Sequence, residues 1–78
     1  MVDKLPSLNA RDVLKILNKT EFYEVSQRGG HLKLRDGKGH TVIVPIHSNK
    51  DIPKGTLLSI IRQAGLAREE FLRIYYEK

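Results

Sequence analysis

The 78-residue sequence contains no cysteine and no tryptophan. Without cysteine there is neither a disulfide framework nor a thiolate metal site, which suits a reducing cytoplasm. No apolar run approaches the roughly 20 residues of a membrane-spanning helix, and the N-terminus lacks the order of a signal peptide. We therefore expect a cytoplasmic protein with no membrane partner. A chain of this length is expected to form one domain, over residues 1–78, around a single core.

Positive charge is what the sequence has in excess. Lys and Arg number 14 against 9 Asp and Glu, which gives a formal net charge of +5 and a pI of about 9.8. The cations are spread along the chain, a pattern typical of proteins that meet polyanions, because each neutralised phosphate releases condensed counterions. Nucleic acid is thus the first candidate partner, although many small proteins are basic without binding it.

Apolar residues at helical spacing predict three helices. The first runs through NARDVLKILNK with Asn9 as its cap, and its apolar face comprises Ala10, Val13, Leu14, Ile16 and Leu17. The second runs through TLLSIIRQAG, with Thr56 or Ser48 as its cap and Gly65 as its stop. Its apolar face comprises Leu57, Ile60, Ile61 and Ala64. A short final helix in AREEFLRIYYEK is anchored by Phe71, Leu72 and Tyr75.

Three strands are predicted between the first two helices, within the stretches FYEVSQR, HLKLRD and HTVIVP. A two-residue turn at Gly29 and Gly30 places Arg28 opposite His31, because such turns need the positive φ that glycine reaches easily. The same register gives the remaining pairs: Gln27 with Leu32, Val25 with Leu34, Tyr23 with Asp36, Ser26 with Lys33 and Glu24 with Arg35.

The second hairpin admits two loop lengths. A two-residue loop would turn Val42 and Val44 onto the polar face, whereas a three-residue loop with a left-handed Gly39 aligns them with Leu34 and Leu32. The longer loop is preferred because it gives the sheet one apolar face, formed by Val25, Leu32, Leu34, Val42 and Val44. The opposite face then carries Arg28, His31, Lys33, Arg35, Thr41 and Ile43.

A histidine within a row of cations is the candidate site. His31, Lys33 and Arg35 alternate along one strand and point the same way, with Arg28 across the turn. A phosphodiester along this row would have its charge balanced by the cations while His31 exchanges a proton with it. The alternative is that His31 is an ordinary surface histidine, and the residues alone leave both interpretations open.

The order helix, three antiparallel strands, helix, with a short C-terminal helix, predicts a two-layer α+β fold. That is the order of double-stranded-RNA-binding domains, in which a basic loop and a helix N-terminus hold phosphates. The segment KDIPKGT offers Lys50 and Lys54 for this purpose. An ordinary solvated loop is the competing interpretation.

The motifs RGGH and VIVPIHSNKDIPKGTLLSIIRQAGLAREEF resemble the HicA toxins of bacterial and archaeal toxin-antitoxin pairs, small ribonucleases with a double-stranded-RNA-binding-domain-like fold. The resemblance implies that His31 is the catalytic histidine, that mRNA is cut without a ribosome, and that a HicB-type antitoxin masks the site. Two positions depart from the family pattern. Gly30 stands where the family usually has serine, and Glu21 stands where it commonly has glycine.

RNA can be cut by attack of its own 2′-hydroxyl on the adjacent phosphate. This reaction needs a base, an acid and positive charge that stabilises the phosphate in the transition state, and it needs no metal or cofactor. We assign the base role to His31 and the phosphate to Arg28, Lys33 or Lys54. His47 is either an auxiliary proton carrier or a residue that fixes its loop by hydrogen bonds, and His40 is expected at the surface. Two other functions remain open: a non-catalytic RNA-binding module, and a protein-interaction domain for an acidic partner.

Overall fold

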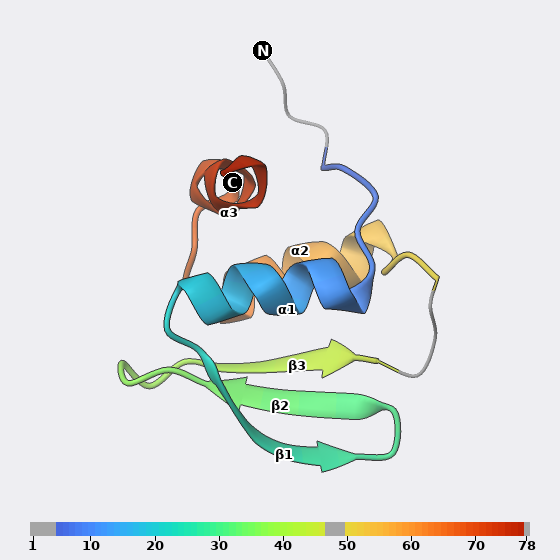
Figure 1. Ribbon diagram of the computed structural model, residues 1–78, viewed down its shortest axis with the longest axis vertical. Helices are drawn as coiled ribbons and strands as arrows, with labels where there is room; N and C mark the ends of the chain where they lie inside the picture. The colour runs from blue at the N-terminus through green and yellow to red at the C-terminus, as the bar shows by residue number, and fades with distance from the viewer. Residues whose placement is uncertain (1–4, 47–49, 78) are drawn as a thin grey trace.

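The computed structural model describes residues 5–46 and 50–77. The elements follow in the order α1 (Ala10–Lys19), β1 (Tyr23–Arg28), β2 (His31–Arg35), β3 (Thr41–Pro45), α2 (Lys54–Gln63) and α3 (Arg68–Tyr76). The strands form one antiparallel sheet in the order β1-β2-β3. Helices α1 and α2 cover one face of this sheet, and α3 packs against α1 on the side away from the sheet (Figure 1). The predicted α+β architecture, with helices on one face of an antiparallel sheet and a short C-terminal helix, is confirmed.

Helix α1 begins at the predicted cap, Asn9, which forms a capping box with Asp12. The Asn9 side chain accepts a hydrogen bond from the Asp12 backbone N–H at 3.0 Å, and the Asp12 carboxylate accepts one from the Asn9 backbone N–H at 3.2 Å. Two of the four unpaired N–H groups at the helix start are thereby satisfied. The helix ends where Glu21 adopts the left-handed conformation, with φ +69°.

Helix α2 begins two residues earlier than the predicted cap, so the assignment of Thr56 was wrong. Its N-cap is Pro53, whose side chain makes no capping hydrogen bond, and Lys54 is the first helical residue. The fixed φ of proline leads the chain directly into the helix, and Thr56 lies inside the first turn. The alternative cap Ser48 lies outside the described residues. The predicted stop is confirmed, because Gly65 has φ +73° just after the helix.

The core lies between the sheet and the helices. The apolar faces predicted for β2, β3 and α2 are buried, comprising Leu32, Leu34, Val42, Val44, Leu57, Ile60, Ile61 and Ala64. In α1, Leu14 is only half-buried, unlike the rest of its predicted face. In α3, Phe71 is buried as predicted, but the second anchor is Ile74, while Leu72 and Tyr75 are half-buried. Positions three apart face one side of a helix, which explains the pairing of Phe71 with Ile74.

The second hairpin has the predicted register. Leu32 pairs with Val44 and Leu34 with Val42, across a three-residue loop in which Gly39 has φ +98°. The alternative two-residue loop is therefore wrong. In the first hairpin the turn also has the predicted length, since Arg28 pairs with His31.

A β-bulge changes the register of β1 beyond the pair of Ser26 with Lys33. Glu24 pairs with Leu34 and Tyr23 pairs with Arg35, so Val25 is the extra residue. The inserted residue moves the side chains of Glu24 and Tyr23, which precede it, to the faces opposite to those predicted. Val25 is consequently 44% exposed instead of buried in the core. Three predicted pairs are therefore wrong: Val25 with Leu34, Tyr23 with Asp36 and Glu24 with Arg35.

The helices cover the sheet unevenly. The Ile43 backbone N–H on β3 donates to Oε1 of Gln63 at 3.2 Å, which ties this edge of the sheet to the end of α2. In β1, by contrast, every residue is exposed. Figure 1 shows β1 as the strand farthest from the helices. The sheet therefore presents an open face and an open edge.

Candidate nucleic-acid interface

The open face of the sheet carries three rungs of paired residues between β1 and β2. Arg28 faces His31 at the turn, Ser26 faces Lys33 in the middle, and Tyr23 faces Arg35 at the far end. Paired residues project from the same face, and successive rungs along β2 lie about 7 Å apart because each strand residue rises about 3.4 Å. On β3, Ile43 pairs with Lys33 and continues this face.

A hollow on the open face brings three predicted site residues together. Its lining comprises Ser26, Arg28, His31, Lys33 and Ile43. His31 and Arg28 are exposed, and Lys33 is half-exposed. An imidazole, a guanidinium and an ammonium thus share one solvent-accessible depression, where a phosphate would meet two positive charges beside a group able to carry a proton. Arg35 extends the row of cations from the next rung.

The two remaining predicted cations lie on a different part of the chain. Lys50 and Lys54 are both exposed, and Lys54 is the first residue of α2. The N-terminus of α2 and the turn between β1 and β2 lie at the same end of the molecule (Figure 1). The positive end of the α2 dipole therefore faces the end at which His31 lies.

His47, the predicted auxiliary residue, lies outside the described residues. The chain just before it is fixed beside the site, because the Ile46 backbone N–H donates to the Gly30 carbonyl at 2.7 Å. This hydrogen bond holds the departing chain against the turn that precedes His31. In that turn Gly29 has the positive φ, at +57°.

A family model for the HicA toxin of bacterial toxin-antitoxin systems matches residues 10–66. The chain belongs to the HicA toxin family. The match runs from the first residue of α1 to Leu66, so α3 follows it. Membership makes the chain the toxin component of a toxin-antitoxin system, a role that implies an antitoxin partner. A search of curated proteins finds no match.

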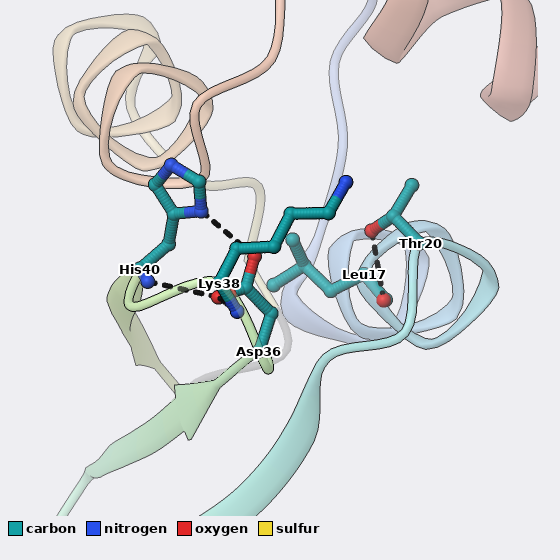
Figure 2. Close-up of polar contacts among 5 residues, drawn as sticks. All are labelled: Leu17, Thr20, Asp36, Lys38 and His40. Atoms are coloured by element: carbon teal, nitrogen blue, oxygen red, sulfur yellow. Dashed lines mark hydrogen bonds and ion pairs between the residues drawn. The ribbon is translucent and has the colours of Figure 1, made fainter.

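The HicA toxin has a second histidine site that the sequence analysis missed. Across the loop between β2 and β3, Oδ2 of Asp36 lies 2.7 Å from Nδ1 of His40 (Figure 2). Oδ1 accepts hydrogen bonds from the backbone N–H groups of His40 at 2.8 Å and Lys38 at 3.0 Å. His40 was expected as an unremarkable surface residue, but it is half-buried and paired. The sequence signal for this pair was an acidic residue four positions before a histidine, with a glycine-containing loop between them.

Asp36 is the group in this loop whose ionisation the structure alters. Its side chain is only 8% exposed. Burial of the carboxylate opposes ionisation, but the hydrogen bonds from the His40 ring and from the backbone of His40 and Lys38 outweigh it and lower the pKa of Asp36. The loop is therefore held by an ionised carboxylate.

His40 also explains why position 65 is glycine. A Cβ built on Gly65 would stand 2.5 Å from Nε2 of His40, and the backbone there has φ +73°. Neither the space nor the backbone conformation suits a side chain. The His40 ring thus occupies the corner where α2 ends.

Within residues 5–46 and 50–77, no group of three or more His, Asp or Glu side chains is arranged to hold a metal ion. Among the same residues, no helix combines the length and apolar character needed to cross a bilayer.

Proposed function

We propose that this toxin is a metal-independent endoribonuclease that cleaves mRNA, with His31 as its catalytic residue. One observation carries the proposal: the imidazole of His31 lines an exposed hollow together with Arg28 and Lys33. Membership of the HicA toxin family supports the same role, because the chain must then damage something that the cell needs. RNA is a polyanion, which matches the net charge of +5.

The chemistry uses a nucleophile that RNA itself supplies. His31 takes the proton from a ribose 2′-hydroxyl, the 2′-oxygen attacks the adjacent phosphorus, and the bond from phosphorus to the 5′-oxygen breaks. The leaving 5′-oxygen receives a proton from an acid, for which we propose His47 or water. The products are a 2′,3′-cyclic phosphate and a 5′-hydroxyl.

The cations stabilise the charge that builds up at phosphorus. Arg28 and Lys33 flank His31 in the hollow, and we assign them to the phosphate that is cut. Arg35 is placed to hold a neighbouring phosphate because it lies one rung farther along β2. Lys54, the first residue of α2, and Lys50, four residues before it, complete the proposed set.

The open face of the sheet is also the proposed binding surface for the antitoxin. We propose that a HicB-type antitoxin covers the open face and thereby blocks RNA, since a masked hollow excludes the phosphate from His31. Because mRNA is the proposed substrate, we place this activity in the cytoplasm. We also propose that residues 1–78 form a single domain.

Substitution of His31 by alanine tests the proposal. We expect the wild-type protein to cut a long unstructured RNA in EDTA, and His31→Ala to cut about 10² to 10⁴ times more slowly, the contribution of one positioned base. Binding on a native gel should persist, because Arg28 and Lys33 remain. Lys38→Ala is the matched control, since Lys38 is an exposed loop residue beyond the other end of β2.

Two results would overturn this assignment. If wild-type and His31→Ala proteins bind the RNA equally and neither cuts it, the chain is an RNA-binding module without catalysis. If neither protein binds RNA at low salt, the basic face serves a protein partner alone.

A further inference from the structure

We propose that Tyr23 forms a stacking subsite for one base of single-stranded RNA, two rungs along the sheet from His31. The inference rests on the proposed function, because it assigns the part of the RNA beyond the phosphate that is cut. It would make Tyr23 a binding residue that places the RNA on the open face, with no part in proton transfer.

The β-bulge at Val25 carries the argument. In a regular hairpin Glu24 would face Arg35 and Tyr23 would face Asp36. The bulge instead places Glu24 opposite the buried Leu34 and Tyr23 opposite Arg35. The extra residue thus removes a negative charge from the cationic face and replaces it with an aromatic ring.

The orientation of Tyr23 follows from its neighbours on both strands. Phe22, the residue just before β1, is only 4% exposed and lies in the core, and Tyr23 is the first strand residue after it. Arg35, its partner, alternates with the buried Leu34 and therefore projects from the open face. Tyr23 itself is 55% exposed. A large ring is therefore presented to solvent on the same face as His31.

The spacing of the rungs suits a single RNA strand. Tyr23 and Arg35 lie about 14 Å from the rung of Arg28 and His31, since each rung adds about 7 Å. Each rung carries at least one cation or the catalytic imidazole, so a strand laid along the rungs meets charge at regular intervals. Aromatic rings beside such a cationic track hold bases by stacking, which every base permits.

A tryptophan placed at position 23 tests the stacking directly. The chain has no tryptophan, so Tyr23→Trp introduces a single tryptophan, whose fluorescence can be excited apart from that of the remaining tyrosines. His31→Ala is included to prevent cleavage, which makes the result independent of catalysis. We expect an unstructured RNA oligomer to quench the fluorescence, and an abasic oligomer of equal length to leave it nearly unchanged. Tyr76→Trp is the matched control, because Tyr76 is 65% exposed but lies on α3.

Affinity gives the second readout. Tyr23→Ala should weaken oligomer binding about 5- to 150-fold, the range for loss of one stacked base, whereas Tyr23→Phe should retain most of the affinity. Tyr76→Ala should bind as the wild type does. Equal quenching by the abasic oligomer, or equal affinity of Tyr23→Ala and wild type, would overturn the subsite.

The outcomes separate this subsite from the ribonuclease proposal. Base-dependent quenching without any RNA cleavage by the wild-type protein would uphold the subsite and reject the enzyme. Cleavage that depends on His31, without quenching at position 23, would uphold the enzyme and reject the subsite.

Discussion

His31 and His40 differ in what surrounds the ring, and this difference is the reason that we propose a reactive role for His31 and a structural one for His40. His31 lies in an open hollow beside two cations, whereas His40 is held by Asp36 against the end of α2. Period-two alternation was enough to place His31, Lys33 and Arg35 on one face. It was not enough for His40, because the contact depends on how the loop folds back over its own carboxylate.

The lowered pKa of Asp36 predicts a loss of stability in acid. A carboxylate whose pKa is lower in the folded state than its usual 3.8 stabilises the fold above about pH 4, and this contribution disappears as the pH falls further. Asp36→Asn should therefore be less stable than the wild type at pH 7, and the difference should shrink towards pH 2. Urea unfolding at several pH values measures it. Asp51→Asn, at an exposed position, is the control, and a constant difference would contradict the assignment.

Replacement of Gly65 should destabilise the fold. In Gly65→Ala the new methyl group meets the His40 ring and the backbone keeps a positive φ, which alone costs about 1 to 2 kcal/mol for a residue with a Cβ. We expect the free energy of unfolding to fall by about 2 kcal/mol or more. Gly37→Ala is the matched control, because nothing lies within 4 Å of a Cβ there. Equal thermal unfolding of the two variants would refute this explanation.

At the scale of elements, the chain segment between α1 and β1 contains one residue with a strained backbone, which a substitution should relieve. Glu21 has φ +69°, which glycine adopts far more easily than a residue with a side chain. Glu21→Gly should raise the free energy of unfolding by about 0.5 to 1 kcal/mol, after the entropy that glycine adds to the unfolded chain is subtracted. Thermal unfolding measures this gain. Glu69→Gly lies inside α3, and it should instead lower the free energy of unfolding by about 1 kcal/mol. A lower free energy of unfolding in both variants would contradict the account.

The elements themselves were predictable where burial selects one arrangement. The alternation of Leu32 and Leu34 with Val42 and Val44 permits only one loop length that buries all four. The bulge at Val25 was not predictable in this way, because β1 is exposed along its whole length and no buried face fixes its register. The start of α2 was missed because the sequence signal favoured a side-chain cap and the structure uses Pro53 without one.

At the scale of the molecule, the helices and the candidate site around His31 occupy opposite faces of one sheet. The helices cover one face (Figure 1), and on the other Arg28, His31 and Arg35 are exposed. The period-two alternation of the strands and the length of the second hairpin loop were sufficient to predict this division. The approach of the α2 N-terminus to the end that carries His31 was not, because it depends on how α2 crosses the sheet.

The central claim is that His31 removes the proton of the RNA's own 2′-hydroxyl. The most direct measurement compares, in EDTA, cleavage of an RNA and of the same RNA with every 2′-hydroxyl methylated, followed by analysis of the new ends. We predict that the wild-type protein cuts only the unmodified RNA and leaves 2′,3′-cyclic phosphates, and that His31→Ala cuts the unmodified RNA about 10² to 10⁴ times more slowly. Cleavage of the methylated RNA, or fragments that end in a 3′-hydroxyl, would contradict the account.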